Sequence, residues 1–399
     1  MRPGHNAGTR WDGVINMQMD QNKIKAQNLR KVFSLISQKA PVTRGELAKE
    51  SKLSLMTISN MVEKLLELGL VTTENRKYDN RIGRKADLVS VDRNNKQVMI
   101  LDLTQMDFSY TVLNIQLEMT VPIQGYCYDR TKEYRDNLVC FLKEIVAFMQ
   151  KQNLEEHVIG VGICIPGPYL IEQDICVNKR IKDLSGIKIK ALLRQYLDKE
   201  ILFIDEDVKL AAVANTYFIA DIKKKTVMYI YLGEGVGGTI IAGGEPLRGI
   251  NSVAGDVGQL FYDSRSNYEE HLSLRAAFLK ITGEESCNCD SAEMISRILQ
   301  AQASNPMAYK KALSDLYHTA ARLLHNIVWL IDPHEIVIEC AYLQQIDPNF
   351  PDMLEKEFAA LVEGVLPGRP QIHYNNSDMK DCYRGVAIEI INHWLDKQQ

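Results

Sequence analysis

The segment Thr43–Leu70, TRGELAKESKLSLMTISNMVEKLLELGL, limits the possible folds most, because it has the pattern of a helix-turn-helix. Thr43 is placed to cap a first helix, with Glu46 three residues later at the spacing of a capping box. Ser54 is placed to cap a second helix. That helix is expected to turn an apolar face inward (Leu55, Ile58, Val62, Leu65) and short polar side chains outward (Thr57, Ser59, Asn60). Such side chains at the front of a second helix are typical of base readout in the DNA major groove.

A helix and a basic hairpin flank this segment. From Lys23 onward, apolar residues recur near one helical face (Ile24, Leu29, Val32, Phe33, Leu35, Ile36), and Pro41 ends the stretch. After Gly69, two strand-like stretches surround a polar turn. The pattern predicts a winged helix-turn-helix that binds double-stranded DNA; a small helical protein-interaction module is the alternative. The candidate DNA contacts are Thr43, Ser54, Thr57, Ser59, Asn60, Arg76, Lys77, Arg81, Arg84 and Lys85.

The charge distribution agrees with a nucleic-acid partner at one end of the chain. Residues 1–90 hold 16 Lys and Arg against 9 Asp and Glu, and the remainder holds 31 against 42. The net charge of −4 therefore combines a basic first segment with an acidic body.

Length and composition restrict the protein class further. A chain of 399 residues exceeds what one hydrophobic core usually holds, so two or three domains are expected. The sequence has no apolar run long enough to span a membrane, and its first twenty residues lack the apolar core of a signal peptide. Its eight cysteines have no disulfide framework spacing. These features predict a cytoplasmic protein with reduced thiols and no membrane partner.

Beyond residue 97 the pattern changes to alternating strands and helices. The stretches VMILDLTQMDFSYTVLNI and TVMYIYLGEGVGGTIIAGG read as strand hairpins, and Leu138–Met149 reads as an amphipathic helix. A buried strand is expected at VIGVGICI, and ILFIDEDVKLAAVANTYF reads as strand, acidic turn and helix. The repetition of hairpin and helix predicts an α/β body with two lobes.

Five motifs in one order resemble the ROK family, whose name stands for repressor, open reading frame and kinase. They are GVGICIPGPY (160–169), DEDVKLAA (205–212), LGEGVGGTI (232–240), LRGINSVAGDVGQ (247–259) and DPHEIVIE (332–339). The resemblance implies the two-lobed actin-like fold of sugar kinases behind an N-terminal winged helix-turn-helix. The expected domains are a flexible arm (1–20), the winged helix (21–92), lobe 1 (97–215) and lobe 2 (216–399), with a late return of the chain to lobe 1.

The resemblance also implies a ligand site. Asp207 matches the aspartate that acts as catalytic base in ROK kinases, and Glu206 replaces the neighbouring asparagine that binds the sugar. The family's A-G-E-x-G-H segment becomes residues 254–259, with Asp256 and Gln259 in place of its glutamate and histidine. Glu269 best matches a second sugar-contacting glutamate, with Glu270 as the alternative register. The expected ligand residues are therefore Glu206, Asp207, Asp256, Gln259 and Glu269.

Three departures from the family predict that the body does not bind ATP. Phosphate oxygens need close approach to backbone N–H groups, which glycines permit. The family's first phosphate loop, D-x-G-G-T, is Asp102–Met106 without a glycine. The later glycine loop gains the acidic Glu234, and the family's last glycine pair becomes Cys340 and Ala341 after Glu339. We therefore expect no catalytic residue and no nucleotide cofactor.

Zinc is also predicted to be absent. Tetrahedral zinc needs clustered thiolates, and the family's C-x-C-G-x-x-G-C run is missing from residues 260–270, LFYDSRSNYEE. Cys287 and Cys289 form a lone C-x-C pair further on, for which packing or solvent exposure is the expected role. Contacts other than metal ligands must then hold this loop.

Together these features favour a transcriptional repressor of carbohydrate-use genes, acting as a homodimer or tetramer and controlled by a small carbohydrate effector. An active ATP-dependent sugar kinase that retains a DNA-binding head is the alternative. A regulator whose body only dimerises is a third possibility. A phosphorylated or acidic sugar derivative remains open as effector, with Lys209 as a residue that would favour it.

Overall fold

The computed structural model describes residues 9–75, 87–178, 181–286, 288–376 and 381–398. Its contacts divide the chain into two compact units. The first comprises Met1–Ile163, Ile189–Ile204 and Val386–Gln399, and the second comprises Cys164–Lys188 and Asp205–Gly385. The second unit thus begins its main segment at Asp205, whereas the sequence places the change of lobe after residue 215. Among the described helices, none is both long and apolar enough to cross a membrane.

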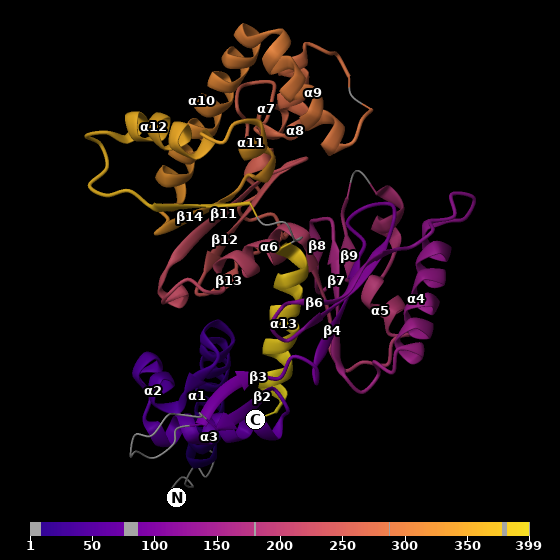
Figure 1. The fold of residues 1–399 in the computed structure, drawn as a ribbon, viewed down its shortest axis with the longest axis vertical. Helices are drawn as coiled ribbons and strands as arrows, with labels where there is room; N and C mark the ends of the chain where they lie inside the picture. Colours follow the sequence, from indigo (N-terminus) through magenta and orange to yellow (C-terminus); the bar gives the residue numbers. More distant parts are fainter. Residues whose placement is uncertain (1–8, 76–86, 179–180, 287, 377–380, 399) are drawn as a thin grey trace, which may run out of the picture. The chain divides into compact units, whose positions relative to one another are not determined.

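The first unit begins with three helices and a small sheet; Figure 1 labels the helices and strands β2 and β3. The helices are α1 (Thr9–Lys39), α2 (Arg44–Ser51) and α3 (Leu55–Glu67), and the strands are β1 (Val42–Thr43), β2 (Val71–Asn75) and β3 (Asp87–Val91). Strands β2 and β3 pair antiparallel, with Val71 opposite Val91 and Asn75 opposite Asp87, and β1 joins the other side of β3. Three helices followed by a two-stranded hairpin form the winged helix-turn-helix that the sequence predicts.

Both helices of this motif have the predicted N-caps. Thr43 Oγ1 accepts a hydrogen bond from Glu46 N at 3.2 Å, and the Glu46 carboxylate accepts one from Thr43 N at 2.8 Å, which completes the capping box. Ser54 Oγ accepts from Thr57 N at 3.1 Å at the start of α3. Because the caps pair N–H groups that the first turns leave open, the two helices have defined starts.

The core of the winged helix is formed largely by the predicted residues. The buried side chains include Leu29, Val32, Phe33, Ile36, Leu47, Ile58, Val62 and Leu65. One prediction was wrong: Leu55, expected to face inward, is 57% exposed. Ile24, at the start of the apolar face of α1, is 56% exposed. Leu55 is the first residue of α3, one turn before the buried Ile58, so it lies beyond the end of the apolar face. Helix α1 also continues through residues 9–20, where the sequence predicts a flexible arm.

The rest of the first unit is a mixed sheet with helices. Its strand order is β10-β7-β4-β5-β6. The elements are β4 (Gln97–Asp102), β5 (Ser109–Asn114), β6 (Met119–Gly125), α4 (Tyr134–Lys151), β7 (Val158–Ile165), α5 (Ile189–Leu193), β10 (Leu202–Glu206) and α13 (Asp381–Lys397). The predicted hairpin is present as β4 and β5, which pair from Gln97 opposite Asn114 to Asp102 opposite Ser109. The predicted amphipathic helix is α4, which buries Leu138, Phe141 and Ile145.

The second unit is built on a sheet of order β13-β12-β11-β14-β15. Its strands are β11 (Thr226–Leu232), β12 (Val236–Ala242), β13 (Glu245–Pro246), β14 (Glu335–Glu339) and β15 (Gln371–Asn375). Strands β11, β14 and β15 run parallel, and β12 runs antiparallel to β11. A separate two-stranded ribbon joins β8 (Tyr169–Leu170) and β9 (Ile175–Cys176).

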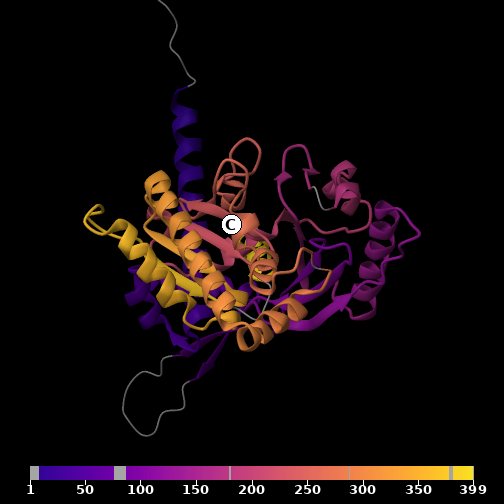
Figure 2. The same cartoon turned by 90° about the horizontal axis from the view of Figure 1, so that it is seen from above.

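Helices cover both faces of this sheet, as Figures 1 and 2 show. One face buries Met228, Ile230 and Leu232 against α7 (Glu269–Leu272), α8 (Leu274–Thr282), α9 (Ser291–Ser304), α10 (Pro306–Ile331), α11 (Ala341–Ile346) and α12 (Phe350–Val362). The opposite face packs Val227 and Tyr229 against α6 (Asp207–Thr216). Alternate residues of β11 therefore enter two different cores, as the period of a strand requires. Short 3-10 helices lie at Lys182–Gly186, Ile222–Lys224 and Val257–Gln259.

Helix α6 is joined closely to the start of α13. The side chain of Asn215, near the end of α6, donates to Asp381 Oδ2 at 2.9 Å, and Asn375 Nδ2 donates to the same oxygen at 2.7 Å. Gly385 lies directly against the backbone of α6, since a Cβ atom there would be 1.8 Å from Leu210 O. The two helices therefore meet backbone to backbone.

Candidate functional site

The acidic turn between β10 and α6 forms the centre of the candidate ligand site. Strand β10 ends at Glu206, and α6 begins at Asp207. Acidic side chains are favoured at this position because the N-terminus of a helix carries partial positive charge. Asp207 Oδ1 accepts a hydrogen bond from Val208 N at 2.8 Å, so the carboxylate of Asp207 already engages the first turn of its own helix.

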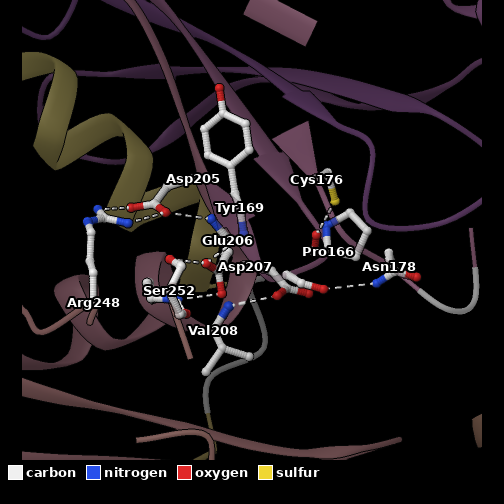
Figure 3. A network of polar contacts seen from close by, with 12 residues as sticks. Pro166, Tyr169, Cys176, Asn178, Asp205, Glu206, Asp207, Val208, Arg248 and Ser252 are labelled. Carbon is white, nitrogen blue, oxygen red and sulfur yellow. Dashed lines mark hydrogen bonds and ion pairs between the residues drawn. The ribbon is translucent and has the colours of Figure 1, made fainter. Parts of the chain in front are cut away.

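Asp205 forms a bidentate ion pair with Arg248, shown in Figure 3. The two guanidinium nitrogens lie 2.9 and 2.5 Å from the two carboxylate oxygens. The Asp205 side chain is only 3% exposed, and it also accepts from Glu206 N at 2.9 Å. The pair therefore holds the loop that contains Arg248 against the end of β10.

Glu206 is buried, and both of its carboxylate oxygens bind groups of the protein itself. Its Oε1 accepts from Tyr169 N at 2.9 Å and from Ser252 Oγ at 2.7 Å, and its Oε2 lies 2.5 Å from Lys209 Nζ. Lys209 Nζ also donates to Ser252 O at 2.6 Å, and its side chain is 4% exposed. Glu206 and Lys209 thus join the Pro166–Tyr169 turn, α6 and the loop before Asp256 into one polar network. Figure 3 labels Tyr169, Glu206 and Ser252 of this network.

Asp256, Gln259 and Glu269 form the other side of the site. Burial, followed by the charges of Glu269 and Glu206, raises the pKa of Asp256 to about 6. Gln259 Nε2 donates to Glu269 Oε2 at 3.0 Å, at the start of α7. The backbone N–H of the alternative Glu270 donates to Asn267 Oδ1, and its side chain is exposed.

The structure therefore brings four of the predicted ligand residues close together in the second unit. The charges of Glu206 and Glu269 both raise the pKa of Asp256, and Gln259 binds Glu269. Asp207 lies in the same unit and follows Glu206 in the chain. Sequence reasoning did not identify Arg248 and Ser252 as members of this site. It proposed Lys209 as a residue for an acidic ligand, whereas the Lys209 ammonium group is buried against Glu206. The spacing of three residues between Glu206 and Lys209 on a helix was the available signal for that ion pair.

In the glycine loop after β11, the backbone of Gly233 packs against the side chain of Tyr231, a residue of β11. A Cβ atom on Gly233 would lie 2.0 Å from the ring of Tyr231, so this phenol rests directly on the loop backbone. The Glu234 carboxylate accepts from Ser291 Oγ, at the start of α9. The loop backbone thus packs against a phenol ring, and its acidic side chain is bound to the start of α9.

A partly buried carboxyl group lies beside Tyr231. Glu339 lies opposite Tyr231 in the pairing of β14 with β11 and accepts a hydrogen bond from Tyr229 Oη. Burial, with the charges of Asp381 and Asp207, raises the pKa of Glu339 to about 7. Acidic and phenolic groups therefore lie at the carboxyl ends of β11 and β14.

The predicted first phosphate loop folds as a local turn in the first unit. Asp102 Oδ1 accepts from Thr104 N at 2.9 Å and from Thr104 Oγ1 at 2.6 Å. The carboxylate of Asp102 is 3% exposed, so it stabilises the turn after β4.

Residues 260–271, where a zinc site would be expected in the family, are held by polar and aromatic contacts. Asp263 Oδ1 accepts from two backbone N–H groups of the turn that follows it, and Ser266 Oγ lies 2.8 Å from His271 Nε2. The rings of Tyr262 and His271 are 4.2 Å apart, and the Arg322 guanidinium lies 4.6 Å above the Tyr262 ring. Across the residues that the structure describes, no three His, Cys, Asp or Glu side chains are grouped to hold a metal ion. Cys287 lies outside the described residues.

The candidate DNA-contacting surface is described only in part. Asn60 is exposed on α3, and Thr57 and Ser59 are partly exposed. Ser54 and Thr57 share a hydrogen bond between their hydroxyl oxygens at 2.8 Å, and Thr43 serves as the cap of α2. The predicted basic residues of the wing lie outside the described residues: Arg76, Lys77, Arg81, Arg84 and Lys85.

Comparisons with known proteins agree with both parts of this architecture. A sequence model of the ROK family matches residues 111–388, and a model of winged helix-turn-helix DNA-binding domains matches residues 26–72. The xylose repressor of Staphylococcus xylosus is 20% identical over 389 residues, which cover 95% of this chain and 98% of that protein.

Solved structures show the same fold. A ROK family transcriptional regulator, described as a homologue of the E. coli MLC protein, aligns with a TM-score of 0.70 at 20% identity. The alignment covers 94% of this chain and 97% of that one. The ROK hexokinase from Thermus thermophilus aligns with a TM-score of 0.58 at 17% identity, over 73% of this chain and 97% of the hexokinase. The match to the hexokinase is confined to a smaller part of the chain than the match to the regulator.

Proposed function

The chain belongs to the ROK family, and we propose that it is a DNA-binding transcriptional repressor of carbohydrate-use genes. A sugar or sugar derivative, bound beside Asp207 in the kinase-like body, controls its affinity for DNA. The observation that carries the proposal is the match to a repressor over 95% of the chain, which spans the winged helix and the body together.

The partners follow from this role. A winged helix reads a short half-site, and a regulator gains affinity and specificity by placing two such heads on one operator. We therefore propose double-stranded operator DNA as the macromolecular partner and a homodimer or tetramer as the active form. Helix α3 with its exposed Asn60 enters the major groove.

The ligand is proposed to contact Asp207, Asp256, Gln259 and Glu269. Carboxylate and amide oxygens accept hydrogen bonds from sugar hydroxyl groups. Asp256 is influenced by the charges of Glu269 and Glu206, Gln259 binds Glu269, and Asp207 follows Glu206 in the chain. Glu206 has a positioning role, because its three side-chain contacts, to Tyr169 N, Ser252 Oγ and Lys209 Nζ, hold together the loops that carry the other residues. Ligand binding changes DNA affinity only if the two states of the protein bind the sugar differently.

We further propose that the protein is not a kinase and uses neither ATP nor zinc. Support comes from the glycine loop, where a Cβ atom on Gly233 would lie 2.0 Å from the Tyr231 phenol, so this ring packs on the loop backbone. Glu339 adds a partly buried carboxyl group beside it, which is unfavourable for nucleotide phosphates.

Retained kinase activity is the second candidate. Asp207 favours it, because this carboxylate stands at the start of α6 in the position that matches the family's catalytic base. Such a base must accept the proton of a sugar hydroxyl during phosphoryl transfer. A regulator whose body only dimerises is the remaining alternative.

A mobility-shift experiment separates the three functions. The purified full-length protein is mixed with DNA from upstream of its own gene, and sugars, sugar phosphates or ATP are then added. Release of DNA by one sugar, with no effect of ATP, supports the ligand-controlled repressor. A phosphorylated sugar formed from ATP would establish the kinase. A DNA complex that is insensitive to all sugars, with no sugar-induced rise in melting temperature, would favour a body that only dimerises.

A further inference from the structure

We propose that the ligand site selects uncharged sugars and excludes phosphorylated or acidic ones, because internal acids already occupy the groups that would bind an anion. This inference rests on the proposed function and names the chemical class of its effector. It is carried by three contacts, each of which uses a different kind of anion-binding group.

The first group is the Lys209 ammonium. It lies 2.5 Å from Glu206 Oε2 and 2.6 Å from Ser252 O, and only 4% of the side chain is exposed. To reach a ligand phosphate, Lys209 would have to leave Glu206. That would leave a buried carboxylate without its counter-ion, which is strongly unfavourable.

The second group is the Arg248 guanidinium. A guanidinium is the side chain best suited to a bidentate grip on phosphate or carboxylate. In this chain the two terminal nitrogens of the Arg248 guanidinium donate to the two carboxylate oxygens of Asp205, at 2.9 and 2.5 Å. The Asp205 side chain is 3% exposed, so solvent does not replace Arg248 as its partner.

The third group is a backbone donor. The N-terminus of α6 is a position where anions commonly bind, but the Asp207 carboxylate accepts from Val208 N there at 2.8 Å. This backbone site is therefore occupied by a side chain of the protein.

The remaining ligand residues add negative charge. Asp207, Asp256 and Glu269 are acids, and the Gln259 amide donates to Glu269. Sugar hydroxyls can donate hydrogen bonds to these carboxylates, whereas a phosphate dianion has only acceptors and would be repelled. This comparison concerns the described residues; Lys179 and Arg180 lie outside them.

The test compares matched ligands on the full-length protein. Calorimetric titrations use glucose, xylose and N-acetylglucosamine, each beside its terminal phosphate ester, at low and at physiological salt. The expected result is that one uncharged sugar binds and that its phosphate binds at least about tenfold more weakly, with the difference reduced by salt. A phosphate ester that binds as tightly as, or more tightly than, its parent sugar overturns the inference.

Two variants test the mechanism. Glu206→Gln keeps a side-chain acceptor for Tyr169 N–H and Ser252 but removes the charge that neutralises Lys209. Asp205→Asn likewise releases the charge of Arg248. Each is expected to lower the ratio of the phosphate ester's Kd to the sugar's Kd by about tenfold or more. The second variant gives the answer if the first does not fold, and an unchanged ratio in the folded variants overturns the mechanism.

A control variant and a DNA assay complete the design. Arg297→Gln removes a basic side chain that pairs with Glu284 in the same unit, outside the network of Figure 3, and it should leave the ratio unchanged. DNA release is measured with the same ligands. If a phosphate ester both binds more tightly and releases DNA, the charge selection fails while the proposed regulator stands. If no ligand of either class binds, both fail.

Discussion

The Arg248 guanidinium holds both carboxylate oxygens of Asp205, at 2.9 and 2.5 Å, across a gap of 43 residues in the chain. Asp205 is the next-to-last residue of the buried strand β10, and Arg248 belongs to the loop that leads to Ser252 and Asp256. One ion pair therefore fixes the geometry between the acidic turn and the opposite side of the site.

Arg248→Met is expected to lower the free energy of unfolding by about 3 kcal/mol, because it leaves the buried Asp205 carboxylate without its counter-ion. Urea denaturation at pH 7 measures the change. The double variant Asp205→Asn/Arg248→Met removes both charges and should recover at least half of the loss. A single variant as stable as the wild type would contradict this account of the pair.

Glu339→Gln is expected to stabilise the protein above pH 7. The folded-state pKa of Glu339 is raised from 4.5 to about 7, chiefly by burial, so the folded carboxyl group binds its proton more tightly than the unfolded one. The free energy of unfolding therefore falls as the pH rises from about 4.5 to about 7. Glutamine removes that slope, with a gain of up to about 3 kcal/mol at pH 8 at about 1.4 kcal/mol per pKa unit.

Thermal denaturation of wild type and Glu339→Gln at pH 5, 6, 7 and 8 checks this prediction. Glu339→Ala is the control, since it removes the charge and also the acceptor of the buried Tyr229 hydroxyl. It should gain less than the glutamine variant. Parallel pH profiles for wild type and Glu339→Gln would show that Glu339 does not titrate in this range.

Asn60→Ala is expected to weaken operator binding by about tenfold, within the range of one lost base contact, without lowering the melting temperature. Asn60 is exposed on α3, six residues after the N-cap Ser54, so its side chain contributes little to the stability of the fold. Asn94→Ala is the matched control, because Asn94 is an exposed asparagine outside α3. Equal operator affinities for the two variants would exclude Asn60 from the DNA contacts.

Gly385→Ala is expected to destabilise the protein by at least about 2 kcal/mol, because the added Cβ atom would lie 1.8 Å from Leu210 O. Leu210 O is a backbone atom of α6, so only a shift of the helices can relieve the clash. Gly368→Ala is the matched control: a Cβ atom there has no neighbour within 4 Å. Its free energy of unfolding should change by less than about 0.5 kcal/mol. Equal stabilities for the two variants would show that the helix crossing adjusts freely.

The sequence predicted best what depends on neighbours along the chain. The caps at Thr43 and Ser54 are read from single residues at fixed spacing, and the strand-turn-helix around Asp205 is read from a local change of pattern. Leu55 was predicted to be buried and is exposed, because helical periodicity does not show where an apolar face ends.

The arrangement of the site was harder to predict because its partners are distant in sequence. Glu206 binds Tyr169 N–H, 37 residues earlier, and Ser252, 46 residues later. The position of the Tyr231 ring over Gly233 depends on the conformation of the loop. Residue identity predicted that these side chains are polar or aromatic, and only the fold determines which atoms they meet.

The close packing of α6 against the start of α13 makes α6 a rigid link between Asp207 and α13. This helix has ten residues and is about 15 Å long, with Asp207 at one end and Asn215 near the other. The Asn215 side chain donates a hydrogen bond to Asp381. Because residue 385 is glycine, no side chain separates the two helix backbones where they cross. A displacement of Asp207 along the axis of α6 is therefore expected to displace the first turn of α13 as well. Helix α13 is the element in which the chain passes from the second unit to the first for the last time.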